Sequence, residues 1–316
     1  MMAIDFSTNP VAQQRGLALI MVLWMLTLLM IMASSFALTI RRETAVLTDV
    51  KALAQARALA EGGINIAMLN LLPLDEKLRW RSDGSLYEIT FADAPIRIRI
   101  SDESGKIDIN FADPVILRNV FSSLGLEEAL LDQLIAAIID WRDPDDIQTP
   151  QGAEKEQYQK AGLSYTPANK PFETVDELQM VLGMTPAFYK QLEPLLTVYS
   201  KSNSVNPAKA SREVLLHLPN ATPEQVDTYL QQRIENARAG LPELAPTWAA
   251  PSSATSHVYE ILAEAMPAEG VTGAVSAVIR SGQARQGLPF TVLKWHKSGT
   301  EHSLFAEAEN NQLMLQ

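Results

Sequence analysis

An uncharged run of 24 residues near the N-terminus, residues 17–40, constrains this chain more than any other feature. About 20 apolar residues in a helix cross the hydrocarbon core of a bilayer, so the run is long enough to span a membrane. It is also longer than the apolar core of an ordinary secretory signal peptide, which has about 7–15 residues. We therefore predict a membrane-spanning helix that stays in the mature protein.

The composition excludes several classes of function. The chain has 316 residues, a net charge of −11 and no cysteine. Nucleic acid is a poor partner for so acidic a chain, because phosphate binding depends on Lys and Arg. Without cysteine there is no disulfide, thiolate metal site or cysteine nucleophile. The four histidines are scattered, and neither His-Glu-x-x-His nor Gly-x-Ser-x-Gly occurs, so we predict no enzymatic activity.

The helical pattern continues beyond the apolar run. Residues 41–72 contain no proline, and their apolar residues recur at about 3.6-residue spacing, which predicts one helix of roughly 50 residues with an amphipathic second half. Residues 86–91 and 96–100 then alternate apolar and polar side chains, as strands do. Strand patterns return at residues 258–263, 273–281 and 290–297.

Between the two groups of strands the sequence is helical. Thr185-Pro186 and Thr222-Pro223 each place a favourable N-cap before a proline at the first helical position. Thr174 with Glu177 has the spacing of a capping box. The helices pair across short turns and resemble helix-hairpin-helix units.

The fold class predicted is α+β: a long N-terminal helix packed on a small antiparallel sheet, with a large inserted all-α domain that contains helix-hairpin-helix-like pairs. The predicted boundaries are 1–16 for a leader, 17–40 for the membrane helix, 41–111 for the amphipathic helix and first strands, 112–250 for the insert, 251–300 for the returning strands, and 301–316 for a poorly ordered tail.

The start of the apolar run resembles a type IV prepilin leader. Gln14-Arg15-Gly16 is followed directly by Leu17-Ala18-Leu19-Ile20. Pilin-like proteins usually have Glu at the fifth position after the leader, and here that position is Met21. A buried carboxylate is costly unless it meets a partner such as the terminal ammonium of a neighbouring subunit. A subunit at the tip of a filament needs no such pair.

The leader without that Glu resembles the K-type minor pseudopilins (GspK family) of type II secretion systems. Further segments of the chain resemble the same family over residues 14 to about 295. These segments are residues 102–110, 139–146 (Ile-Asp-Trp-Arg-Asp-Pro-Asp-Asp), 152–154, Tyr158, 171–172, 176–178, 182–185 and 196–200.

The resemblance implies a processing route and a set of partners. A prepilin peptidase would cleave between Gly16 and Leu17 and methylate the new N-terminus at Leu17. The helix would anchor the chain in the inner membrane with its N-terminus cytoplasmic and its C-terminal domain periplasmic, although positive-inside counting favours the opposite orientation. I-type and J-type minor pseudopilins and an inner-membrane assembly platform are the implied partners. The implied role is to cap the tip of the pseudopilus and start its assembly.

An acidic stretch supplies the candidate metal ligands. Calcium takes several oxygen ligands on a flexible loop, but the spacing here does not fit an EF-hand. The resemblance implies that calcium binds the globular part of the protein. The candidate ligands are Asp140, Asp143, Asp145, Asp146, Glu154 and Glu156.

Two other functions remain open from the sequence. The chain could be a minor tip pilin of a type IV pilus or of a competence pseudopilus. From a different class, it could be a membrane-anchored helix-hairpin-helix DNA receptor. The second hairpin has Asn220 where such DNA-binding turns usually have Gly, and the charges around it are balanced. A protein-binding surface is therefore favoured over a DNA-binding one.

Overall fold

The computed structural model describes residues 17–72, 78–250, 252, 254–282, 289–297, 303–306 and 314–315. The first helix, α1, runs from Leu17 to Leu71 and confirms the prediction of one long helix. It is long and apolar enough, by length and composition, to cross a membrane. The chain divides into two units, residues 1–53 and 54–316, so only the last part of α1 belongs to the unit that contains the sheet.

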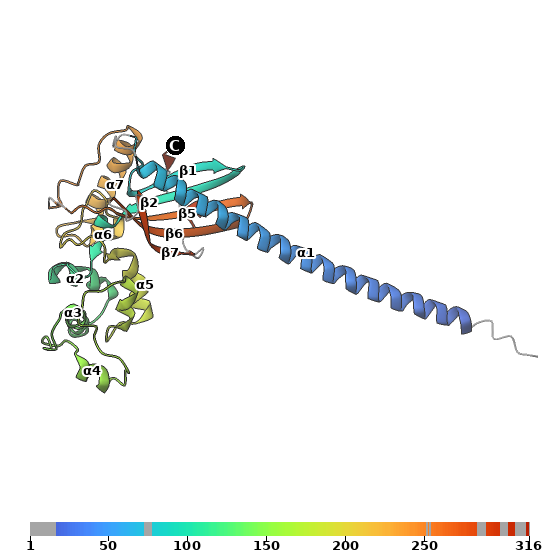
Figure 1. Ribbon diagram of the computed structural model, residues 1–316, viewed down its shortest axis with the longest axis horizontal. Helices are drawn as coiled ribbons and strands as arrows, with labels where there is room; N and C mark the ends of the chain where they lie inside the picture. Colours follow the sequence, from blue (N-terminus) through green and yellow to red (C-terminus); the bar gives the residue numbers. More distant parts are fainter. Residues whose placement is uncertain are drawn as a thin grey trace, which may run out of the picture. The chain divides into compact units, whose positions relative to one another are not determined.

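The main sheet has the strand order β7-β6-β5-β2-β1-β8. Neighbouring strands from β7 to β1 are antiparallel, whereas β8 pairs with β1 in parallel. Figure 1 shows the second half of α1 along one face of this sheet. The strands are β1 (Asp83–Phe91), β2 (Ala94–Asp102), β5 (Val258–Ala268), β6 (Val271–Ser281), β7 (Phe290–His296) and β8 (Met314–Leu315).

Small residues let α1 approach the sheet closely. A Cβ on Gly63 of α1 would lie 2.9 Å from Ile96 Cγ2 of β2, and a Cβ on Gly273 of β6 would lie 2.8 Å from the backbone nitrogen of Arg57. The buried face of the helix contains small residues too, because Ala56 and Ala60 are buried while Ala58 is exposed. Small side chains therefore replace part of the larger apolar stripe that the amphipathic pattern predicted.

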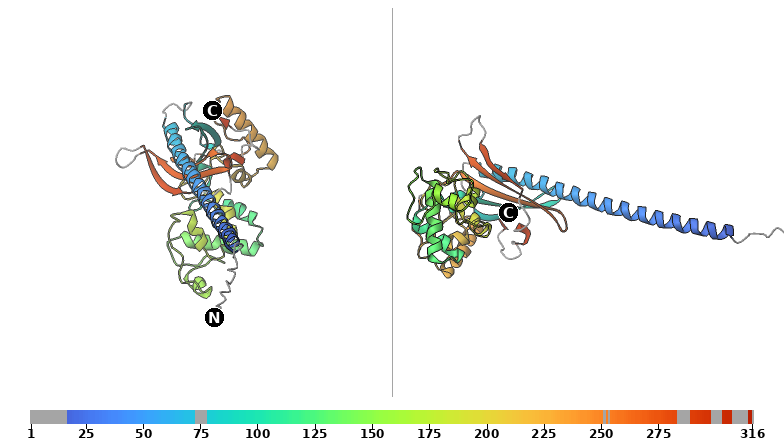
Figure 2. Two further views of the ribbon diagram at one scale, coloured as in Figure 1. Left: turned by 90° about the vertical axis from the view of Figure 1, so that its right-hand side faces the viewer. Right: turned by 90° about the horizontal axis from the view of Figure 1, so that it is seen from below.

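The whole helical insert occupies one connection between adjacent strands. Asp102 at the end of β2 is paired with Tyr259 near the start of β5, so the chain leaves the sheet and returns to it at the same place. Figure 2 shows the insert gathered at one end of the strands. Its elements are η1 (Glu103–Gly105), β3 (Ile107–Asp108), α2 (Pro114–Phe121), η2 (Ser122–Leu124), α3 (Glu128–Arg142), α4 (Lys155–Lys160), η3 (Val175–Met180), α5 (Pro186–Leu192), η4 (Glu193–Leu195), β4 (Leu196–Thr197), α6 (Arg212–Leu216) and α7 (Pro223–Arg238).

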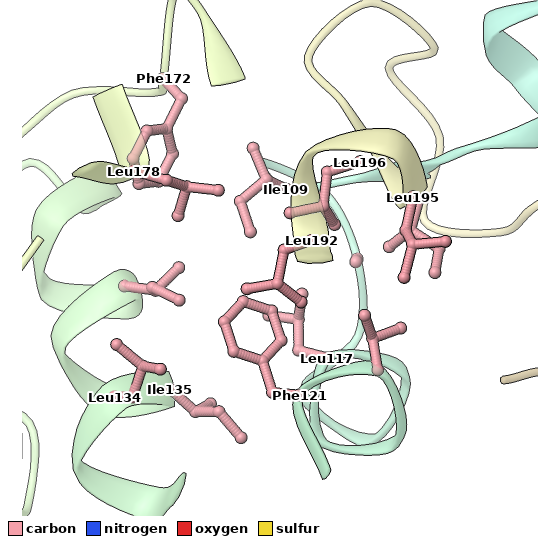
Figure 3. Packing of buried hydrophobic residues seen from close by; sticks show 14 of the residues in the cluster. Ile109, Leu117, Phe121, Leu134, Ile135, Phe172, Leu178, Leu192, Leu195 and Leu196 are labelled. Carbon is pink, nitrogen blue, oxygen red and sulfur yellow. The ribbon is translucent and has the colours of Figure 1, made fainter. Parts of the chain in front are cut away.

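The insert has a hydrophobic core of its own. Phe121 of α2, Leu134 of α3 and Leu192 of α5 converge with Phe172 and Leu178, as Figure 3 shows. Ile107 and Ile109 lie within the range, residues 41–111, that was predicted to hold the first strands of the antiparallel sheet. They belong instead to this core, because β3 pairs in parallel with β4 in a separate two-stranded sheet.

An ion-pair network lies where the insert joins the sheet. The Nζ of Lys106 is 2.9 Å from Glu103 Oε1 and 2.6 Å from Glu260 Oε2 on β5. Glu103 also accepts a hydrogen bond from the Thr197 hydroxyl on β4. Burial raises the pKa of Glu103. Burial opposes the charge of Lys106, but the two carboxylates outweigh it and raise the pKa of Lys106.

The helix caps follow the sequence, but several helices are shorter than predicted. Thr174 and Glu177 form the predicted capping box, and Thr185 and Thr222 cap α5 and α7. Residues 175–180, however, form a 3-10 helix, which a positive φ at Gly183 follows closely. The first helix of the second hairpin begins at Arg212, and before it the backbone N–H of Ala208 bonds to the Asn206 side chain.

Part of the C-terminal segment packs on the outer face of the sheet, the face opposite α1. Leu304 is fully buried against Leu86 and Leu262, and Glu264 accepts hydrogen bonds from the Ser303 hydroxyl and the Leu304 N–H. The expectation of a poorly ordered tail after Ser303 is therefore wrong for residues 303–306. A buried carboxylate and an apolar patch on the sheet hold this segment, which we call the C-terminal clasp, and no local pattern revealed them.

Candidate functional site

The acidic segment lies at the C-terminal end of α3, above a cluster of aromatic rings. Trp141 is stacked on Phe172 with ring centroids 6.0 Å apart, and Tyr158 is tilted against Trp141 at 6.2 Å. The Tyr158 hydroxyl accepts a hydrogen bond from the Leu182 N–H. Asn110 exchanges two hydrogen bonds with the backbone of Phe172. Segments that are distant in the sequence thus build one rigid platform under the acidic loop.

Asp140, at the end of α3, anchors the acidic loop through a hydrogen bond. Its side chain is fully buried and accepts a hydrogen bond from the Thr149 N–H at 3.1 Å. A Cβ on Gly152 would lie 2.1 Å from Asp140 Oδ2, so only glycine fits beside this carboxylate. No sequence pattern pointed to Thr149, which contributes only its backbone N–H.

Glu154 is the most unusual of the predicted residues. It is buried, and neither of its carboxylate oxygens has a hydrogen-bond partner. One buried carboxylate oxygen of Asp143 also has no hydrogen-bond partner. Burial raises the pKa of Glu154 to about 7, with further contributions from four negative neighbours. These neighbours are Asp140, Asp143, Asp146 and Asp145.

Burial also raises the pKa of Asp143, with contributions from Asp145 and Asp140. Unpartnered buried carboxylates are rare in native structures, and a cation satisfies them. The residues present therefore fit a hard cation. Within the described ranges, however, no three acidic or histidine side chains converge closely enough to hold a metal ion as they stand.

The remaining acidic residues are more exposed. Asp145 accepts a hydrogen bond from the Ile147 N–H, and Asp146 accepts one from the Asn169 side chain at 2.8 Å. Glu156 lies apart from the others: it is exposed and pairs with Lys160 at 2.8 Å. The structure thus brings five of the six candidate carboxylates into one electrostatic cluster and leaves Glu156 outside it.

The predicted processing residues lie at the start of the chain. Gly16 is outside the described residues, and Leu17 is the first residue of α1. Met21 is exposed within the apolar half of α1. Further along, Val46, Leu47 and Val50 are exposed as well, so exposed apolar residues continue past the membrane-length run.

In the second hairpin, which α6 and α7 form, Arg212 and Arg233 bind acceptors within the hairpin and the residues just before it. Arg212 makes a bidentate pair with Asp227, and Arg233 donates to the backbone carbonyl of Ala210. Asn220, in the turn, adopts a positive φ of 63°, the conformation for which glycine is usual. The turn between α6 and α7 is therefore a structural element with internally balanced charge.

Comparison with known proteins shows which family the chain resembles. The family model "Type II secretion system (T2SS), protein K" matches residues 100–201, which contain the aromatic platform and the acidic loop. Type II secretion system protein K of Klebsiella pneumoniae is 29% identical over 248 residues, which cover 70% of this chain and 76% of that protein. The protein of the same name from Pseudomonas aeruginosa PAO1 is 30% identical over 148 residues, which cover 44% of each chain.

A solved structure is similar as well. It is the crystal structure of the GspK-GspI-GspJ complex from the type 2 secretion system of enterotoxigenic Escherichia coli, with a TM-score of 0.49 and 17% identity, covering 82% of this chain and 99% of that one. The long N-terminal helix on an antiparallel sheet defines a pilin-like protein. Within that class the chain is similar to type II secretion system protein K, over residues 100–201 by the family model and over 70% of the chain in the Klebsiella relative.

Proposed function

We propose that this minor pseudopilin caps the tip of the type II secretion pseudopilus and nucleates its assembly. Met21 carries the proposal. It stands in the apolar half of α1 where pilin-like subunits usually have Glu, so the chain offers no carboxylate to the terminal ammonium of a neighbouring subunit. A subunit at the tip needs no such pair.

The insert supports the same role. Residues 103–257 all lie between two neighbouring strands and form a helical body at one end of the sheet. A body of this size is difficult to repeat along a closely stacked shaft and is readily accommodated at an end. The role is one of binding and nucleation, and the chain carries out no reaction of its own.

Tip location is testable by labelling. A short epitope inserted beside Ile147, which is 75% exposed in the acidic loop, should be accessible without disturbing either core. In cells that overproduce the pseudopilus, immunogold should label one end of each filament. An epitope in the major subunit labels the shaft and serves as the control. Label distributed along the shaft would contradict the proposal.

We further propose that prepilin peptidase cleaves after Gly16 and methylates Leu17, and that the chain then sits in the inner membrane with its globular part in the periplasm. N-terminal mass spectrometry of the chain from membranes should find methylated leucine as the first residue. An N-terminus at Met1 would refute the processing step. A protease added to spheroplasts should degrade the globular part, and protection would refute the orientation.

The partners proposed are the I-type and J-type minor pseudopilins and the assembly platform. The exposed apolar residues Val46, Leu47 and Val50 favour helix-to-helix contact with such subunits, because they extend the α1 stripe beyond the bilayer-length run. Purified globular parts of the three proteins should form a stable ternary complex at micromolar concentration in size-exclusion chromatography. Elution of three separate species would contradict the assignment of partners.

Calcium is proposed as a ligand of the acidic loop. The central candidate ligands are Glu154, Asp143 and Asp140. Glu154 and Asp143 have buried oxygens without a hydrogen-bond partner, and Asp140 is held beside them by the Thr149 N–H. Asp145 and Asp146 are on the same loop. When bound, the cation would neutralise the cluster and order the loop.

Isothermal titration calorimetry of the globular part should detect calcium, and Glu154→Gln should weaken binding at least tenfold. Glu156→Gln is the matched control, because Glu156 is paired with Lys160 and should leave binding unchanged. Absence of binding at millimolar calcium would exclude the site.

A further inference from the structure

The two edges of the main sheet differ in how they are closed. At the β1 edge, β8 from the chain's own C-terminus pairs with Leu86 and Tyr87. At the other edge, β7 pairs with β6 on one side, and among the described residues no strand pairs with its other side. An unpaired edge presents backbone donors and acceptors to an incoming strand, and proteins usually blunt such edges with Lys or Pro.

The lysine of β7 does not blunt the edge, because it is engaged elsewhere. Lys294 bonds to Asp176 of η3 at 3.0 Å. Val292 and Trp295 are instead 49% and 43% exposed. They pair with Ile279 and Ala277 of β6, which belong to the core beneath α1. The edge therefore shows a valine and a tryptophan on the same face of the sheet that α1 covers.

Around this edge the cations outnumber the carboxylates, which are Asp176 and Glu193 near Lys294. The net charge is −11, yet three exposed basic residues flank the two apolar ones. They are Arg280 on β6, His296 at the end of β7, and Lys297 immediately after it. A second copy of this chain would present the same cations, and an edge-to-edge pair would bring like charges together.

We propose that β7 is a docking edge for an edge strand of a neighbouring pilin-like subunit, one that carries Asp or Glu beside an apolar side chain. This inference rests on the proposed function and adds the surface and its chemistry. Backbone hydrogen bonds along β7 would give affinity, as in other cases where a strand is added to a sheet. Trp295 would be the central anchor, because buried tryptophans dominate interface energies. The cations Arg280 and Lys297 would select an acidic partner.

The first experiment uses the full chain in membranes. A photo-crosslinking amino acid replaces Val292, and the cells also produce the I-type and J-type minor pseudopilins of the same system. The control position is Val115 on α2, which is 61% exposed and belongs to the helical insert instead of the main sheet. An adduct with either pseudopilin from position 292 and none from position 115 supports the proposal. An adduct with a second copy, with an exported protein, or with neither pseudopilin overturns it.

The second experiment measures the affinity of the full chain for the I-type and J-type minor pseudopilins. Trp295→Ala should weaken the complex at least tenfold, which is typical of a central tryptophan. Val292→Lys, which blunts the edge, should act in the same direction. Lys297→Glu should weaken binding more at low salt than at high salt. Ile147→Ala, another exposed apolar residue, is the control and should have no effect.

The outcomes separate this inference from the proposed function. If the unmodified chain forms the ternary complex and the β7 variants bind equally well, the docking edge is wrong while the proposed function stands. If the unmodified chain forms no complex, the assignment of partners fails and the docking edge fails with it. Circular dichroism of each variant confirms that a loss of binding is not a loss of fold.

Discussion

Lys106 is the residue on which the junction between the insert and the sheet depends. Its ammonium lies within 2.9 Å of Glu103 and within 2.6 Å of Glu260, and the Glu103 side chain is only 3% exposed. Removal of one partner from such a cluster leaves buried charge without compensation, which typically costs about 3–5 kcal/mol. The network therefore makes the two parts of the fold depend on one another.

Lys106→Met should accordingly lower the free energy of unfolding of residues 54–316 by about 3 kcal/mol in urea denaturation. Adding Glu103→Gln should recover part of the loss, because one of the stranded carboxylates is then neutral. Lys160→Met is the control, since Lys160 and Glu156 form an exposed pair and should contribute nothing measurable. Equal effects of the two lysine changes would refute the role assigned to Lys106.

Glu154 should make the stability of the calcium-free protein depend on pH. Its folded pKa is about 7, above the ordinary value of 4.5, so the folded state binds the proton more tightly than the unfolded state. The stabilisation is complete below the unfolded pKa and is lost as the pH rises through 7. Glu154→Gln should therefore stabilise the protein at pH 8 by on the order of 1 kcal/mol.

The measurement is urea denaturation with chelator present at pH 5.5 and pH 8. The wild type should lose stability between these two values, and the variant should lose less. Calcium should restore the wild type at pH 8 and have little effect on Glu154→Gln. Parallel pH profiles for the two proteins would contradict the assigned pKa.

At the scale of elements, the contact of α1 with the sheet depends on small residues. Gly62 and Gly63 are neighbours on the helix but have different surroundings. A Cβ on Gly62 would meet nothing within 4 Å, whereas one on Gly63 would lie 2.9 Å from Ile96 Cγ2 and 3.2 Å from Ala263 Cβ. The two positions therefore separate helix propensity from packing.

Gly62→Ala should stabilise the protein by about 0.5–1 kcal/mol, because alanine is the better helix former and the site is open. Gly63→Ala has the same gain in propensity but must displace the side chain of Ile96, so we expect a net loss of about 1 kcal/mol. Thermal unfolding of the two variants should shift Tm in opposite directions. Shifts of the same sign would show that α1 can move away from β2 without cost.

At the scale of the whole molecule, the main sheet joins strands that lie far apart in the sequence. The first part of the sheet is formed by β1 and β2. Strands β5, β6 and β7 return after the entire insert, and the C-terminal clasp packs against Leu86 on β1. Arg97 donates to the carbonyl of Phe305 at 3.0 Å and lies over its ring, 4.3 Å from the centroid. The Glu264 carboxylate thus holds the Ser303 end of the clasp, and the Arg97 guanidinium holds the Phe305 end.

Leu304→Asp should lower the free energy of unfolding by about 3 kcal/mol, because it places a carboxylate in an apolar site beside Glu264. Val115→Asp is the matched control, since Val115 is exposed on α2 and the change should have little effect. Urea denaturation of residues 54–316 measures both. If the two variants are equally stable, the clasp contributes nothing to the fold.

Local patterns in the sequence were sufficient for much of the fold. The apolar run, the 3.6-residue period and the alternating strands predicted α1 and the strand pairs, because each reflects interactions between residues that are near in the chain. The threonine caps were predictable for the same reason. The 3-10 helix at residues 175–180 was not, since its length depends on where the chain turns at Gly183.

The sequence by itself determined the class of the protein: a membrane-length helix, a pilin-like sheet and a helical insert with an acidic loop. Only the tertiary structure decided which acidic side chains matter. It buried Glu154 without partners and paired Glu156 with Lys160, although the two residues are only two positions apart. It also turned Lys294 toward Asp176 and left Trp295 at the sheet edge. Burial and long-range pairing depend on which segments meet in space, and no local pattern records that.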